Sequence, residues 1–237
     1  MPQFSRWFNE EHAAKLVNRW AALYADIVDK EGEYDEFEPG ETFVEDIMSK
    51  LDATGSEEVL IMGCGAGKEV DLFRKAGYDT VGTTIGIGNI IRAREVYGIT
   101  DMVETCIEST TFDDNTFDVI VARHVLEHAV SPLLALLEMN RVLKPGGKVF
   151  IEVPGCPGFI EAISESERDP YHIVYPDNNI GATLLNKSNF EDINVHCDED
   201  QASRLYKFTA TKRHFNTTPE ALKRMYRREG GENVSRT

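Results

Sequence analysis

The segment that most constrains the fold is a short apolar run that ends in three closely spaced glycines. Residues 59–67 are Val-Leu-Ile-Met-Gly-Cys-Gly-Ala-Gly, and a helical pattern follows from Lys68 to about Lys75. Four consecutive apolar residues predict a short strand. Glycine has no Cβ, so the backbone after this strand can turn sharply and approach a ligand. A strand, a glycine turn and a helix in this order predict a nucleotide-type site at the edge of an open α/β sheet.

Strands and helices alternate along the chain from residue 58 to about 153, as expected for a parallel sheet with helical crossovers. Two more strands are predicted closer to the C-terminus, after a loop-rich stretch. The expected strands are Val59–Met62, Thr80–Thr83, Met102–Ile107, Asp118–Ala122, Lys148–Val153, Ile193–Cys197 and Leu205–Thr211. Ser131-Pro132 is expected to begin a helix, because serine is a common N-cap and proline fits the first helical position.

The pattern divides the chain into three parts. Residues 1–57 form a helical extension or cap, in which His12–Val28 and Glu41–Leu51 carry apolar residues at helical spacing. Residues 58–214 form the main α/β domain, and residues 215–237 form a basic tail. The tail is either a solvated helix or a segment that docks on an acidic surface of this chain or of a partner.

Composition narrows the class of partner. The chain has 237 residues, 41% of them hydrophobic, and a formal net charge of −16. A charge of that sign repels nucleic acid and anionic membranes, so neither is an expected partner. No apolar run approaches the roughly 20 residues of a membrane-spanning helix, and no signal-peptide core follows the first residues. The four cysteines are widely spaced, as in a cytoplasmic protein with reduced thiols.

Three further segments follow the glycine turn in a fixed order. They are Phe-Asp-Val-Ile at 117–120, Leu-Glu-His at 126–128 and Leu-Lys-Pro-Gly-Gly at 143–147. With the glycine turn, they resemble the S-adenosylmethionine-dependent methyltransferases that have a Rossmann-like sheet. The resemblance is close over residues 58–153 and looser to residue 212. It implies a mostly parallel seven-stranded sheet with helices on both faces, whose last strand, Leu205–Thr211, runs antiparallel beside Lys148–Val153.

The resemblance implies S-adenosylmethionine as the cofactor, yet the chain departs from the family at three positions. Acids that usually contact the cofactor are replaced by Ile61, Thr84 and Cys106. A threonine hydroxyl makes a weaker, neutral hydrogen bond, and Glu108 is a candidate replacement at the adenine edge. The expected cofactor-binding residues are Gly63, Cys64, Gly65, Gly67, Thr84, Ile85, Cys106, Ile107, Glu108 and Arg123.

The catalytic candidates are His124 and His128, just past the fourth strand, where open sheets bind ligands. A neutral histidine there can accept a proton from the acceptor as the methyl arrives. The alternative is a structural turn braced by Glu127. His124, Glu127, His128 and His172 also resemble the ligand set of metal-assisted O-methyltransferases, but we predict no metal.

In the family, the region after the fifth strand covers the substrate pocket. The resemblance therefore makes Phe159, Tyr171, His172 and Tyr175 candidates for substrate contact, with a packed surface loop as the alternative. The leading hypothesis is methyl transfer to an oxygen or nitrogen of a small-molecule acceptor. The alternatives are a non-catalytic sensor or scaffold of the same fold, and an enzyme of this fold that uses another nucleotide-like ligand.

Overall fold

The computed structural model describes residues 40–155, 177–200 and 203–214, together with scattered helical positions between residues 15 and 26. The rest of the predicted helix His12–Val28 lies outside the described residues, as does the whole basic tail. The four substrate-contact candidates lie outside them too: Phe159, Tyr171, His172 and Tyr175.

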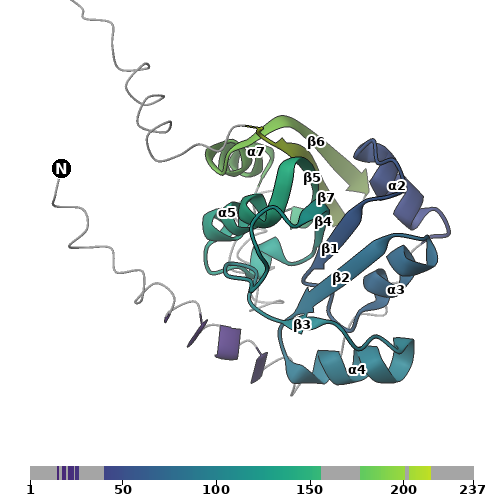
Figure 1. The fold of residues 1–237 in the computed structure, drawn as a ribbon. Coiled ribbons are helices and arrows are strands. Elements are labelled where there is room, and N and C mark those ends of the chain that lie inside the picture. Colours follow the sequence, from purple (N-terminus) through teal and green to yellow (C-terminus); the bar gives the residue numbers. More distant parts are fainter. Residues whose placement is uncertain are drawn as a thin grey trace, which may run out of the picture.

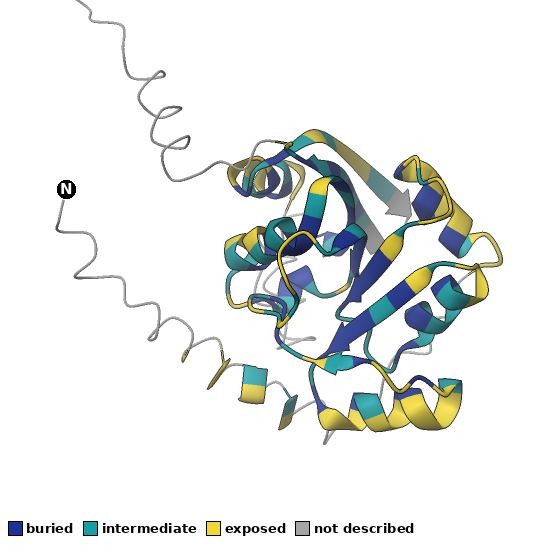
Figure 2. Cartoon of the chain, in the orientation of Figure 1, coloured by how far each residue is buried: buried dark blue, intermediate teal, exposed yellow. Residues whose placement is uncertain are grey.

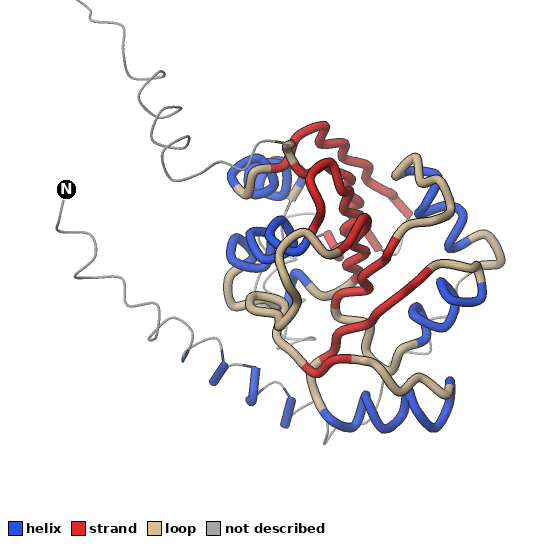
Figure 3. The backbone as a smooth tube through the Cα atoms, in the orientation of Figure 1, coloured by secondary structure: helices blue, strands red, loops and turns tan. Residues whose placement is uncertain are grey.

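A single seven-stranded sheet forms the centre of the fold (Figures 1 and 3). Its order is β3-β2-β1-β4-β5-β7-β6, and every neighbouring pair is parallel except those that include β7. The strands are β1 (Glu58–Met62), β2 (Asp79–Thr84), β3 (Val103–Glu104), β4 (Phe117–Arg123), β5 (Leu143–Gly155), β6 (Phe190–Asp200) and β7 (Ser203–Lys212). The predicted antiparallel strand beside β5 is confirmed, with Lys148 opposite Thr211.

Helices cover both faces of the sheet (Figure 1). One face carries α2 (Phe43–Lys50), α3 (Lys68–Lys75) and α4 (Ile87–Tyr97). The other carries η2 (Leu126–His128), α5 (Pro132–Val142) and α7 (Asn178–Lys187). The predicted helices over Glu41–Leu51, after the glycine turn and after Ser131 are therefore confirmed. As expected of an N-cap, the Ser131 hydroxyl accepts from the backbone N–H of Leu134 at 3.4 Å.

The core lies in two layers, one on each side of the sheet. β1 shows the division most clearly, because alternate side chains of a strand point to opposite faces. Leu60 and Met62 join the cluster under α5 and α7, whereas Val59 and Ile61 join the cluster under α2, α3 and α4. All four side chains are buried, and Figure 2 shows the same burial along the central strands.

Two elements differ from the sequence prediction. The third strand was expected over Met102–Ile107, but β3 comprises only two residues, because the chain turns at Cys106, which bridges Ser109 instead. The helix α7 was not predicted. Its start is marked by Asp177, whose carboxylate accepts from the backbone N–H of Ile180 at 2.7 Å.

None of the helices within the described ranges is long and apolar enough to cross a membrane.

Candidate functional site

The glycine turn lies at the carboxyl end of β1, and all three glycines have positive φ: +77° at Gly63, +51° at Gly65 and +89° at Gly67. A Cβ on Gly63 would lie 2.3 Å from Val125 Cγ2, and one on Gly67 would lie 2.9 Å from Met102 Sδ. The space beside Gly63 and Gly67 is thus filled by protein. We expected all three to face a ligand, but packing alone already requires glycine at these two positions.

The carboxyl end of β2 holds a buried polar pair in place of the usual acid. Thr84 and Asn89 are both 3% exposed. Asn89 Nδ2 donates to Thr84 Oγ1 at 2.9 Å and to the Ile85 carbonyl at 3.0 Å, while Asn89 Oδ1 has no hydrogen-bond partner. A buried acceptor without a donor is costly. Asn89 Oδ1, at the carboxyl end of β2, is therefore a buried neutral acceptor that a donor such as a ligand hydroxyl would satisfy.

Cys106 and Glu108, which we expected to contact the adenine ring, contact each other instead. Cys106 Sγ lies 2.5 Å from Glu108 Oε2, and burial, with the neighbouring Glu108, raises the pKa of Cys106 to about 12. The thiol therefore stays protonated and donates to the carboxylate. Glu108 Oε1 also accepts, at 3.5 Å, from the backbone N–H of Ser131. Glu108 is thus engaged within the protein, and Ile107 is buried beside it.

Arg123, at the end of β4, is the centre of a buried ion-pair cluster. Its guanidinium contacts Glu69 Oε1 at 2.6 Å and Glu152 Oε1 at 2.5 Å. It also lies 4.9 Å from the ring centroid of Phe43. Burial raises the pKa of Glu69, whereas the hydrogen bonds and charges of His124 and Arg123 outweigh burial at Glu152 and lower its pKa to about 2. Arg123 thus links α2, α3, β4 and β5 and is engaged as a structural cation.

His124 continues this cluster. Its φ is +49°, and its backbone N–H donates to the Glu152 carbonyl at 2.9 Å. Its Nδ1 lies 3.6 Å from Glu127 Oε1, and its Nε2 lies 3.4 Å from Glu152 Oε1. The carboxylates of Glu127 and Glu152 raise the pKa of His124 to about 9. At neutral pH the ring is therefore a cation between two anions, although 46% of the side chain is exposed.

This geometry does not favour the role of general base that we expected for His124. An imidazolium has no lone pair with which to accept a proton, and both ring nitrogens already face carboxylates. His124 would accept a proton only above about pH 9, rather than near pH 6.5. His128 lies in η2, where its backbone N–H donates to the Val125 carbonyl at 3.1 Å. No three potential ligands among the described His, Cys, Asp and Glu residues come together as a metal site.

Three participants in these contacts were missed by the sequence prediction. Glu152 is an acid between apolar neighbours in β5, which is a recognisable signal because buried charges need partners. Glu69 is an acid in the first turn of α3, where such residues are common. Asn89 could not be recognised as a site residue from the sequence, since asparagine on a helix is ordinarily exposed.

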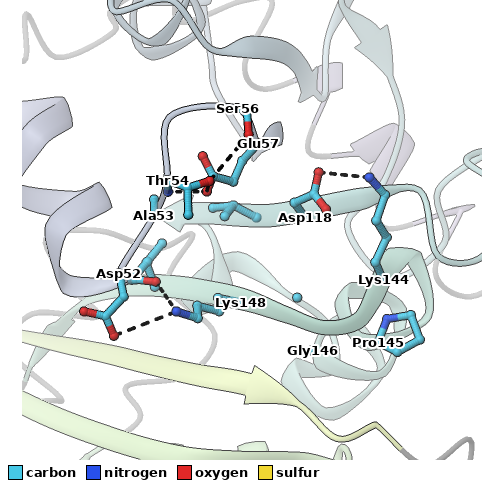
Figure 4. A pocket seen from close by; sticks show the side chains of 13 residues that line it. Asp52, Ala53, Thr54, Ser56, Glu57, Asp118, Lys144, Pro145, Gly146 and Lys148 are labelled. Carbon is cyan, nitrogen blue, oxygen red and sulfur yellow. Dashed lines mark hydrogen bonds and ion pairs between the residues drawn. The ribbon is translucent and has the colours of Figure 1, made fainter.

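A cavity of about 350 Å³ lies at the opposite, amino edge of the sheet (Figure 4). Asp52, Asp118, Lys144 and Lys148 line it, and their charges are paired. Because open sheets bind ligands at the carboxyl ends of their strands, this cavity is not part of the candidate site.

The raised pKa of His124 predicts a pH-dependent stability. A group whose folded pKa exceeds its unfolded value stabilises the fold below the unfolded value and loses that effect as pH rises through the folded value. We therefore expect the stability advantage of the wild type over His124→Asn to be largest below pH 6.5 and to disappear towards pH 9. Asparagine is a suitable replacement because it tolerates positive φ. Urea unfolding at pH 6, 7.5 and 9.5 measures the difference, and a pH-independent value would contradict the assignment.

Sequence comparison connects this geometry with known proteins. Residues 60–151 match the model of a family described as a methyltransferase domain. The chain is 36% identical over 93 residues to a ubiquinone biosynthesis O-methyltransferase of Roseobacter denitrificans, covering 38% of each protein. It is 27% identical over 131 residues to a demethylmenaquinone methyltransferase of Renibacterium salmoninarum, covering 55% of this chain and 52% of that protein. The matches thus span about half or less of these relatives.

Solved structures share the fold at low sequence identity. A phosphoethanolamine N-methyltransferase of Haemonchus contortus, in complex with S-adenosylhomocysteine, superposes with a TM-score of 0.61 at 15% identity, covering 73% of this chain and 53% of that one. The [4+2]-cyclase SpnF has a TM-score of 0.61 at 16% identity, covering 76% and 85%. The strand order, the glycine turn and the family match agree. Residues 60–151 are therefore similar to a methyltransferase domain, and the chain has the Rossmann-like fold of these solved structures.

Proposed function

We propose that this protein transfers the methyl group of S-adenosylmethionine to an oxygen or nitrogen of a small-molecule acceptor. The observation that carries the proposal is the position of the glycine turn. Its left-handed glycines follow β1, and the polar groups at the ends of β2, β4 and β5 lie on the same edge of the sheet. The match of residues 60–151 to a methyltransferase domain supports the same activity.

The residues at this edge fit the cofactor at two points. Gly65 has positive φ, so a side chain there would be strained and the bare backbone can approach a ligand. Asn89 Oδ1 is a buried acceptor that needs a donor, and the cofactor ribose carries two hydroxyls. The cofactor, when bound, supplies an electrophilic methyl group on a sulfonium.

In such a transfer, the protein acts chiefly by positioning the reactants. Bringing two reactants together in line removes much of the entropic barrier, so no strong base is required. The side chains of His124 and Arg123 are held in place at the end of β4, because each contacts two carboxylates. A proton released by the acceptor is lost to solvent, since His124 is itself protonated at neutral pH.

A second candidate function is ligand binding, or other chemistry on a nucleotide-like ligand, without methyl transfer. The specific observation in its favour is that Thr84 and Cys106 occupy positions where the family usually has acids. Both are engaged within the protein rather than left free. The similar fold of SpnF, described as a [4+2]-cyclase, illustrates that this fold is not confined to methyl transfer.

A thermal-shift measurement with S-adenosylhomocysteine tests the proposal. Because a ligand that binds only the native state stabilises it by mass action, a concentration of 100 times Kd is expected to raise Tm by about 5–10 °C. NAD at the same concentration is the comparison ligand, since it shares the adenosine. A shift with NAD alone would favour the second candidate, and no shift with S-adenosylhomocysteine at millimolar concentration would contradict the proposal.

The variant Gly65→Ala tests whether the ligand binds at the glycine turn. We expect this variant to lose most of the thermal shift, because the added Cβ strains the turn and blocks backbone approach. Gly77→Ala is the matched control. Its glycine also has positive φ, but a Cβ there meets nothing within 4 Å, and it lies away from the turn.

A further inference from the structure

The ionic cluster at the carboxyl edge joins carboxylates and cations from several elements. Arg123, His124 and Lys207 are the cations, and the carboxylates are those of Glu69, Glu127, Glu152 and Asp198. His196 of β6 also lies beside Asp198, at 2.8 Å. His196 is a fourth cation when it is protonated, so the number of charges alone leaves no carboxylate over.

Glu127 is the carboxylate of this cluster whose oxygens make no hydrogen bond. Its side chain is 0% exposed, and neither oxygen has a hydrogen bond. Among the described residues, Glu127 forms an ion pair with His124 Nδ1 at 3.6 Å, which is beyond hydrogen-bond length. Burying a carboxylate without hydrogen bonds is expensive. What Glu127 lacks is therefore an N–H donor within hydrogen-bond distance.

The cluster reaches the surface at His124, although Glu127 itself is fully buried. Glu127 lies in η2, directly after β4, and Glu152 lies in β5 beside it. This is the edge at which open sheets bind their ligands. His124 is half exposed, so the cluster reaches the surface there. The net charge of −16 adds to this local effect, because it attracts cationic solutes and repels anionic ones.

We propose that the cluster around Glu127 and His124 is an ammonium-binding subsite that takes the amine of the methyl acceptor. This inference rests on the proposed function and narrows it from an oxygen or nitrogen acceptor to an amine. An ammonium group supplies the N–H donors that Glu127 lacks. Before its nitrogen accepts the methyl group, it loses one proton to solvent, which frees the lone pair that attacks the methyl carbon as the bond to sulfur breaks. An alcohol supplies one neutral donor, and a carboxylate adds a further negative charge to the site.

The test uses three small probes of the same length: butylamine, butanol and butyrate. Each is titrated into the wild-type protein while the imidazole signals of His124 are followed by NMR. A second cation within about 4–6 Å disfavours the charged ring, so butylamine is expected to lower the pKa of His124 by about 1. Butanol and butyrate are expected to leave it unchanged. Equal effects of all three probes, or none from butylamine, would overturn the inference.

Glu127→Gln identifies the residue responsible. We expect this variant to weaken butylamine binding about 10- to 100-fold, the value of one hydrogen bond to a charged group. Glu95→Gln on the exposed face of α4 is the matched control, with the same chemical change away from the cluster, and is expected to bind butylamine like the wild type. If Glu127→Gln does not fold, the three-probe titration of the wild type still decides the question.

A parallel measurement distinguishes the acceptor from the cofactor as the source of the ammonium. S-adenosylhomocysteine carries an amino-acid group, whereas 5′-methylthioadenosine does not. If Glu127→Gln weakens binding of the former and not of the latter, the subsite holds the cofactor, and the assignment to the acceptor is overturned. If S-adenosylhomocysteine does not bind the wild type at all, the proposed function fails, while the amine titration stands as an independent result.

Discussion

Gly63→Ala is expected to lower the free energy of unfolding by about 2–5 kcal/mol, the combined cost of a left-handed alanine and of overpacking. Gly63 has a φ of +77°, and its added Cβ would lie 2.3 Å from Val125 Cγ2 and 2.7 Å from Val125 Cβ. Since Val125 is held between β4 and η2, it has little freedom to withdraw. Urea unfolding followed by circular dichroism measures the loss.

Two companion variants separate the steric cost from the backbone cost. Gly77→Ala introduces a left-handed alanine where a Cβ meets nothing within 4 Å, so it reports the backbone cost alone. The double variant Gly63→Ala/Val125→Ala removes the methyl groups that the new Cβ would meet, and should be less destabilised than the sum of the two single variants. If Gly63→Ala costs no more than Gly77→Ala, the contact with Val125 does not constrain this turn.

Arg123→Met is expected to cost about 3–5 kcal/mol at neutral pH, because it leaves buried carboxylates without their cation. The guanidinium side chain is 8% exposed, and its partners Glu69 and Glu152 are 14% and 5% exposed. Methionine retains much of the volume, so the loss reports mainly charge. Lys144→Met is the control: its pairs with Glu58 and Asp118 are about one third exposed or more, and such surface pairs contribute up to about 1 kcal/mol.

The cost of Arg123→Met should also depend on pH. Glu152 has a folded pKa of about 2, below its ordinary value of 4.5. A lowered pKa stabilises the fold above the unfolded value, and this stabilisation is lost as pH falls through the folded value. The difference between wild type and variant should therefore be full above pH 4.5 and shrink as pH falls towards 2. Unfolding measured from pH 7 down to pH 3 tests this, and a cost equal to that of Lys144→Met at every pH would exclude the proposed role of the cluster.

Most of the helices and strands, and their order, could be predicted from patterns of neighbouring residues. The apolar run of β1, the glycines after it, the helix α3 and the Ser131 cap of α5 were all predictable, because each depends on residues adjacent in the chain. The antiparallel position of β7 followed from the resemblance to a family of known topology. The short β3 and the helix α7 were not found, because a chain turn at Cys106 and a cap at Asp177 are weak local signals.

Which side chains meet at the carboxyl edge could not be read from the sequence, because it depends on how the sheet is assembled. Arg123 is 54 residues from Glu69 and 29 residues from Glu152, and parallel strands bring the three together. That juxtaposition gives His124 two carboxylate neighbours, raises its pKa, and replaces the base suggested by the sequence with an imidazolium. It likewise places Val125 against Gly63, so a glycine that we expected to serve a ligand is required by packing. Local patterns specify strands and helices, whereas charge and pKa depend on groups that become neighbours only after the sheet has formed.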